Sequence, residues 1–298
     1  MKRCAILAAT ALALQAGPAR AELFYLIVGG LGGNPGYVER FAGDAADMAV
    51  AAERTLGSAE RVRVLVGDNA TRDALREALA ELATAASAAD RLAVFLIGHG
   101  SYDGTAYKFN LEGEDIDGAE LSELLAAVPA QSQLLVNMTS ASGSVLEEWA
   151  AAEGRAVITA TRSGAERNAT RFAEHWATAL SAEDADMNKN GSISAREAFD
   201  YTARLVADSF ETEGTLATEH PQLRGEAAGA FEVSRLTARV ALTPEVDALN
   251  ARLAGLEEQV AALRTRREEL GDDYLPQLQA LLVELALVQE QIDEATAE

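Results

Sequence analysis

Thiol chemistry is almost absent from this sequence of 298 residues. Its single cysteine is Cys4, and its three histidines are His99, His175 and His220. Cys4 lies in a segment that we expect to be removed, as argued below. The mature chain would then contain no disulfide, no thiolate nucleophile and no cysteine ligand for a metal.

Positive charge is scarce as well. Lysine and arginine together number 25 against 47 aspartate and glutamate residues, which gives a net charge of −22 at pH 7. Nucleic acids and anionic lipids carry negative charge and would be repelled by such a chain. We therefore expect no nucleic-acid partner, whereas a peptide or protein partner is compatible with this charge.

The sequence contains no hydrophobic run of about twenty residues. Its first apolar run is shorter and has the surroundings expected of a signal peptide. Lys2 and Arg3 precede an apolar run at 5–14, and Ala19-Arg20-Ala21 then supplies small residues around a cleavage site. The sequence predicts a signal peptide at 1–21 with cleavage after Ala21, and a secreted or periplasmic protein. Cleavage would remove three basic residues and no acids, and the net charge would become −25. No later run is long enough for a transmembrane anchor.

The part of the chain at 22–235 alternates between strand and helix patterns. Apolar runs closed by glycine or hydroxyl residues predict buried strands, whereas apolar residues spaced by three and four predict helices. The expected strands are 22–28, 61–66, 92–97, 132–138 and 155–160. The expected helices are 37–56, 71–85, 117–127, 145–152, 171–182 and 195–207, and a short strand is expected at 107–111. This alternation predicts an α/β domain with a mostly parallel sheet and helices on both faces.

Three of these strands run directly into small, polar loops. The loops read GHGS at 98–101, TSASGS at 139–144 and TRSG at 161–164. Because the carboxyl ends of parallel strands lie at one edge of a sheet, His99 and Ser140 are expected to face the same cleft. Arg162 could bind a carboxylate of a peptide there. The alternative for Arg162 is an ordinary surface position in an acidic protein.

The loops resemble those of the caspase-hemoglobinase fold, and in particular of the legumain-like cysteine peptidases. In that family a buried strand ends in a histidine followed by Gly-Ser, and the next strand ends in Ala-Cys, a variable residue and Ser-Gly-Ser. Gly98-His99-Gly100-Ser101 matches the first motif, and Ser142-Gly143-Ser144 matches the end of the second. The resemblance covers about 24–223 and implies a caspase-like three-layer sandwich. Ser140 stands at the position of the catalytic cysteine.

This replacement leaves three functional interpretations. A serine hydroxyl is a weaker acid than a thiol and needs a base that is itself held in place. The first interpretation is a peptidase homologue with an impaired or binding-only cleft. The second is a serine-type peptide hydrolase that uses Ser140 and His99, with an oxyanion hole from the Gly100 and Ser140 amides and with Asp103 or Asp115 orienting His99. The third is a scaffold that acts through its C-terminal helices.

A separate motif at 186–197 predicts a calcium site. The segment DMNKNGSISARE has the order of an EF-hand loop, with oxygen side chains at positions one, three and five, glycine at six and glutamate at twelve. The predicted Ca²⁺ ligands are the side chains of Asp186, Asn188, Asn190, Ser194 and Glu197 and the backbone carbonyl of Ser192. Only two of these carry charge and no second loop is present, so we expect modest affinity.

The C-terminal segment at 243–298 differs in composition from the rest of the chain, since it is rich in alanine, leucine, glutamate and arginine, and this composition predicts helices. A heptad-like seam is formed by Val246, Leu249, Leu253, Leu256, Val260 and Leu263. Gly271 and Pro276 interrupt it, and a second seam is formed by Leu275, Leu278, Leu282, Leu285 and Ile292. Two helices that fold back as an antiparallel coiled-coil hairpin would explain the break. The alternative is self-association as a dimeric coiled coil.

Overall fold

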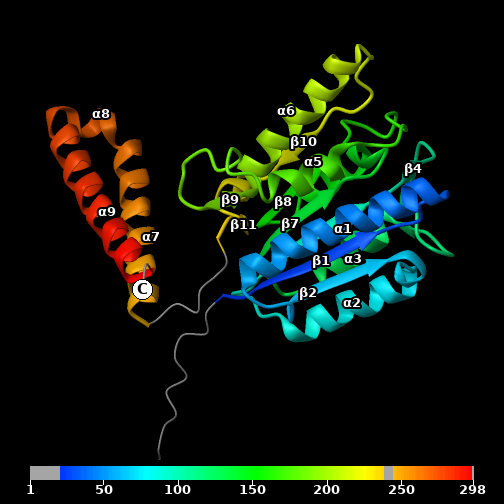
Figure 1. Cartoon of the computed structure of the whole chain (residues 1–298), viewed down its shortest axis with the longest axis horizontal. Helices are drawn as coiled ribbons and strands as arrows, with labels where there is room; N and C mark the ends of the chain where they lie inside the picture. The colour runs from blue at the N-terminus through cyan, green and yellow to red at the C-terminus, as the bar shows by residue number, and fades with distance from the viewer. Residues whose placement is uncertain (1–20, 238–243, 297–298) are drawn as a thin grey trace, which may run out of the picture.

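The computed structural model describes residues 21–237 and 244–296, so the predicted signal segment before Ala21 lies outside the described residues. Its centre is a six-stranded sheet with the order β10-β8-β7-β3-β1-β2 (Figure 1). The strands are β1 (Leu23–Gly29), β2 (Val62–Val66), β3 (Arg91–Ile97), β7 (Ser132–Asn137), β8 (Arg155–Thr159) and β10 (Gln222–Arg224). The first five pair in parallel, and β10 runs antiparallel to β8. The predicted α/β class with a mostly parallel sheet is confirmed.

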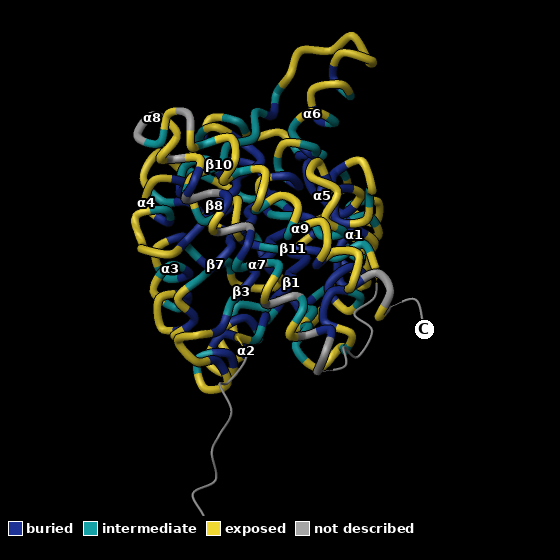
Figure 2. The backbone as a smooth tube through the Cα atoms, turned by 90° about the vertical axis from the view of Figure 1, so that its left-hand side faces the viewer, coloured by how far each residue is buried: buried dark blue, intermediate teal, exposed yellow. Residues whose placement is uncertain are grey.

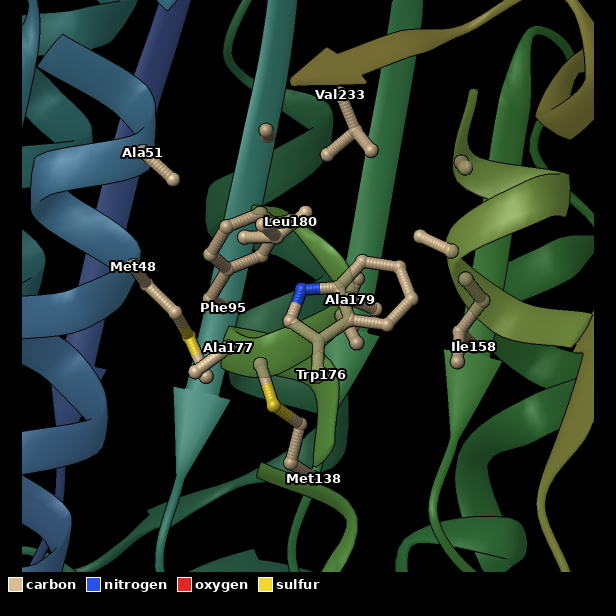
Figure 3. Packing of buried hydrophobic residues seen from close by; sticks show 14 of the residues in the cluster. Met48, Ala51, Phe95, Met138, Ile158, Trp176, Ala177, Ala179, Leu180 and Val233 are labelled. Atoms are coloured by element: carbon tan, nitrogen blue, oxygen red, sulfur yellow. The ribbon is translucent and has the colours of Figure 1, made fainter. Parts of the chain in front are cut away.

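Helices cover both faces of this sheet. One face packs against α1 (Pro35–Leu56), α5 (Phe172–Ala179) and α6 (Ala195–Glu213). The other packs against α2 (Arg72–Ala85), α3 (Gly118–Ala126) and α4 (Leu146–Ala150). Alternate residues of β3 enter opposite layers, since Phe95 packs with Met48 and Trp176 (Figure 3) whereas Val94 belongs to the other core. The inner strands β1, β3, β7 and β8 are therefore almost entirely buried and are dark blue in Figure 2, whereas the edge strands β2 and β10 are only partly buried.

Two small sheets and several 3₁₀ turns complete this domain. The first sheet contains β4 (Gly100–Tyr102), β5 (Tyr107–Phe109) and β6 (Ile116–Asp117), and the second pairs β9 (Ser192–Ser194) with β11 (Glu232–Arg235). The 3₁₀ turns of this domain are η1 (Gly67–Asn69), η2 (Ser142–Val145) and η3 (Glu226–Gly229), and η4 (Gly271–Asp273) belongs to the C-terminal segment. The sequence predicted a strand around β5, but it did not predict β4, β6, β9, β10 or β11. These strands are two to four residues long and have no apolar run of their own.

The C-terminal segment forms helices α7 (Pro244–Thr265), α8 (Arg267–Leu270) and α9 (Tyr274–Thr296). Helices α7 and α9 pack against each other through Val246, Leu256, Val288 and Ile292, which are buried. The predicted second seam is wrong at Leu275 and Leu282, which are 69% and 45% exposed. Leu281 takes the inner face of α9 instead, beside Leu285 and Ile292, which were predicted correctly. Among the described helices, none is both long and apolar enough to cross a membrane.

Candidate functional site

Ser140 lies at the carboxyl edge of the sheet, three residues after the end of β7, and it is only 2% exposed. Its hydroxyl accepts a hydrogen bond from the Gly100 amide at 3.1 Å and donates one to the Gly100 carbonyl at 3.0 Å. The hydroxyl proton is thus directed at a backbone carbonyl, and the amide predicted to form an oxyanion hole is bonded to Ser140 itself. This arrangement holds the two rim loops together and leaves neither group aimed at a substrate.

His99 follows β3 and is half-buried against helix α1. Its ring lies edge-on to Tyr37 and Phe41, with centroid separations of 4.7 and 5.2 Å. Burial lowers the pKa of His99, a hydrogen bond to the Gly32 backbone acts in the opposite direction, and nearby Arg40 lowers the pKa further. The imidazole is therefore neutral at pH 7. A neutral imidazole could act as a base, but in the described chain the His99 ring packs on Tyr37 and Phe41, whereas the Ser140 hydroxyl bonds to Gly100.

The two aspartates expected to orient His99 are bonded within their own turns. The Asp103 carboxylate accepts the Ala106 amide at 2.9 Å, and these local amide bonds lower its pKa. The Asp115 carboxylate accepts the Leu111 amide at 3.2 Å. In the described chain, the hydrogen bonds of both carboxylates stay inside the 103–115 region. Neither therefore supplies the third member that a serine-type triad would need.

A buried polar cluster that the sequence analysis missed lies close to Ser140. The Tyr107 hydroxyl lies 2.6 Å from Oγ1 of Thr139 and 3.2 Å from Oδ1 of Asn137, and the Thr139 hydroxyl also donates to Asn137 Oδ1 at 2.8 Å. Burial raises the pKa of Tyr107 to about 12, and the hydrogen bonds to Thr139 and Asn137 only partly offset this. Tyr107 therefore stays protonated. The signal in the sequence was weak, since it consists of single polar residues at strand ends.

Arg162 is at the rim, as predicted, but it already has a partner. Its side chain is 62% exposed and pairs with Glu166, with 3.0 Å between Nε and Oε1. Glu166, whose side chain is 10% exposed, also lies 2.6 Å from Nδ1 of His220. Glu166 and His220 were not predicted as rim residues, because 54 positions separate them and no local pattern connects them. A bound carboxylate would have to compete with Glu166 for Arg162.

The loops after β7 and β8 are tied together by several hydrogen bonds. The Ala141 amide donates to the Glu166 carbonyl at 2.7 Å, and the Gly143 amide donates to Thr161 Oγ1 at 2.9 Å. Ala141 adopts a left-handed backbone with φ of 58°, which is uncommon for a residue with a Cβ atom. The bend turns the chain from β7 into η2 and buries Ser140 behind it.

The predicted calcium loop lies between α5 and α6. Its first and last acidic residues, Asp186 and Glu197, accept hydrogen bonds from backbone amides of the loop. Asp186 accepts the Asn190 amide at 3.2 Å and the Gly191 amide at 2.8 Å. Glu197 accepts the Met187 amide at 3.2 Å and the Asn188 amide at 3.3 Å. Gly191 has φ of +79°, which is the conformation required at the sixth position. The carboxylates at positions one and twelve thus lie on either side of the loop interior.

Both flanks of this loop are anchored. Ile193 at the eighth position is fully buried, and its strand β9 pairs with β11 where an EF-hand would usually pair with a second loop. Ser194 and Glu197 form a capping box that begins α6. Within the described residues no group of three His, Cys, Asp or Glu side chains is placed to hold a metal. A cation in this loop would depend on amide, hydroxyl and backbone oxygens beside its two carboxylates, and the residues present fit such a donor set.

No protein-family model and no curated protein matches this chain. Solved structures that it resembles include protein GSU0716 from Geobacter sulfurreducens, with 18% identity and a TM-score of 0.47, covering 73% of this chain and 99% of that one. The Drosophila initiator caspase Dronc has 10% identity and a TM-score of 0.43, covering 72% and 81%. Raptor from Chaetomium thermophilum has 10% identity and a TM-score of 0.37, covering 93% and 34%. No activity, ligand or partner follows at this level of similarity.

Proposed function

We propose that this is an exported calcium-binding protein that resembles the legumain-like peptidases and whose rim cleft binds without hydrolysing peptides. The observation that carries the calcium assignment is the loop at 186–197. Its two carboxylates, Asp186 and Glu197, are 3% and 9% exposed. In the described chain their bonds come from backbone amides and from Ser194, and no lysine or arginine pairs with them. Buried carboxylates without a basic partner favour a cation.

Calcium titration of the chelator-treated mature protein tests this assignment. We expect saturable heat with a Kd of about 10⁻⁴ to 10⁻³ M, as in extracellular modules. At free calcium about ten times Kd, binding should raise the free energy of unfolding by about 1.4 kcal/mol. Asp186→Asn should weaken affinity about tenfold or more, because the first ligand loses its charge.

The matched control is Asp184→Asn. Asp184 is exposed, lies two positions before the loop and carries the same charge, yet it is not a predicted ligand. Equal weakening in both variants would show a general electrostatic effect and contradict the site. The absence of saturable heat, or unchanged affinity after Glu197→Ala, would also contradict it.

The proposal predicts that Ser140 does not react as a nucleophile. Its hydroxyl is engaged on both sides by Gly100, and an incoming acyl group would have to break both bonds. A fluorophosphonate probe should therefore leave the wild-type protein unlabelled under conditions that label an ordinary serine hydrolase. Labelling that disappears in both Ser140→Ala and His99→Ala would instead support the serine-type hydrolase.

Export is supported by the surroundings of the expected new N-terminus. Cleavage after Ala21 would convert the Glu22 amide into an ammonium group, and this nitrogen lies 2.7 Å from Oδ1 of Asp90. Burial acts to raise the pKa of Asp90, but hydrogen bonds from Glu22 and Ser87 outweigh it and the pKa is lowered. A charged amine would therefore meet an ionised partner. We expect the intact mass of the exported protein to begin at Glu22, and a different first residue would contradict the cleavage site.

A further inference from the structure

A cavity of about 390 Å³ lies at the amino-terminal ends of β1 and β3, opposite the edge that carries His99 and Ser140. Three arginines line it: Arg61 before β2, Arg91 at the start of β3 and Arg235 at the end of β11. Such a cluster is unexpected in a chain with 25 basic and 47 acidic residues. The volume is within the range of small-molecule sites, about 300 to 1,000 Å³.

Two of the arginines are held by glutamates that also line the cavity. Arg61 pairs with Glu22 at 2.7 Å, and Arg235 pairs with Glu232 at 2.8 Å. The Nε atom of Arg61 is nevertheless buried and has no hydrogen-bond partner in the described chain. Because solvent does not reach this atom, a molecule in the cavity could not bond to it, and Arg61 contributes its charge alone.

Arg91 is the third arginine and makes no ion pair within residues 21–237 and 244–296. Its guanidinium lies over the ring of Phe231, 5.6 Å from the centroid. Stacking of this kind fixes the plane of the guanidinium and leaves its donors available to an oxyanion. With two glutamates against three arginines, the lining carries one net positive charge. The ammonium group created by the proposed cleavage faces Asp90, so that pair adds no net charge.

We propose that this cavity binds a monocarboxylate with an apolar body. The carboxylate would accept hydrogen bonds from Arg91 beside the charge of Arg61, and the apolar body would contact Leu23 and Leu56, which also line the cavity. A single net charge matches a monoanion, whereas a phosphate dianion would leave excess negative charge in an already acidic protein. The ligand is either a free organic acid or the carboxyl terminus of a peptide, because both present the same group.

Titrations monitored by the NMR signals of the arginine Nε–H groups test this site in the mature protein. Hexanoate represents a free acid, N-acetylleucine represents a peptide terminus, and hexanamide is the uncharged control. Hexanoate or N-acetylleucine should give saturable shifts at Arg61 and Arg91, and hexanamide should not. The acid that binds more tightly shows whether the ligand is a free organic acid or the carboxyl terminus of a peptide. Inorganic phosphate that binds more tightly than both, hexanamide that binds equally, or no saturable shift would overturn the proposal.

Two variants distinguish a binding role from a structural one. Arg91→Gln should weaken binding about tenfold, which corresponds to about 1.4 kcal/mol, while Arg91→Lys should keep part of the affinity because it keeps the charge. Arg63→Gln is the matched control, since Arg63 belongs to strand β2 of the same sheet, lies outside the cavity and has a side chain that is 52% exposed. Arg91→Gln with unchanged affinity would overturn the assignment, provided that its amide spectrum shows the wild-type fold.

Discussion

Gly143→Ala is expected to destabilise the protein by about 3 kcal/mol or more. A methyl group at this position would overlap backbone atoms of Thr161, Arg162 and Ser163. A long side chain could move aside, but these atoms belong to the main chain directly after β8. That chain is held in place by the bond from the Gly143 amide to Thr161 Oγ1 and by the bond from Ala141 to Glu166. Relief of the overlap must separate the two rim loops.

Urea unfolding of Gly143→Ala beside Gly43→Ala measures this effect. Gly43 is exposed on helix α1, and a methyl group there would meet no atom within 4 Å. The control should therefore gain about 0.5 to 1 kcal/mol, because alanine loses less backbone entropy than glycine in a helix. If both variants show the same small change, the loops after β7 and β8 are not packed as described.

The strands of the central sheet could be predicted because their burial on both faces leaves a direct trace in the sequence. Val94, Phe95 and Leu96 alternate between the two cores, yet all three are apolar, so the run is continuous. The rim position of His99 and Ser140 follows from the parallel order of β3 and β7. For these features, local composition and the rules of sheet topology were sufficient.

The surroundings of the predicted site residues depend on contacts between distant segments, and these could not be predicted. The aromatic neighbours of His99 come from α1, about sixty residues earlier. The bonds between Ser140 and Gly100 need two loops to meet in one register, and no residue type signals this in advance. Strand β9 contains only Ile193 as an apolar residue, and its partner β11 follows forty residues later. The sequence therefore indicated which residues lie at the site, but it did not indicate which groups they contact.

Asp44→Asn is expected to stabilise the protein at neutral and alkaline pH. Asp44 belongs to α1, is 8% exposed, and its Oδ2 atom has no hydrogen-bond partner in the described residues. Burial raises the pKa of Asp44 to about 6, Arg40 lowers it, and Glu174 and Asp47 raise it further. The folded state therefore binds the proton more tightly than the unfolded state does. The penalty of the charged form is absent well below the ordinary pKa of 3.8 and grows until the pH exceeds about 6.

The neutral amide of asparagine removes this penalty. The gain in the free energy of unfolding should be about 1 to 3 kcal/mol at about pH 8, and it should be smaller by about 1 kcal/mol at about pH 5, where the folded carboxyl is mostly protonated. Burial also raises the pKa of Glu219, to about 7, and this carboxyl adds its own pH dependence to the free energy of unfolding. That contribution is the same in the wild type and the variant, so it cancels in their difference.

Urea unfolding at both pH values measures the difference, and Asp47→Asn is the matched control. Asp47 lies three residues further along the same helix but is exposed, so its replacement should change stability by less than about 0.5 kcal/mol at either pH. The result to look for is a gain in Asp44→Asn that widens from pH 5 to pH 8 while the control stays flat. A gain of the same size at both pH values would mean that the folded carboxyl is already ionised at pH 5 and that burial does not raise its pKa. A loss at pH 8 would mean that an unrecognised donor holds the Asp44 carboxylate. The sign of the pH dependence therefore decides whether the interface between α1 and α5 contains an uncompensated charge.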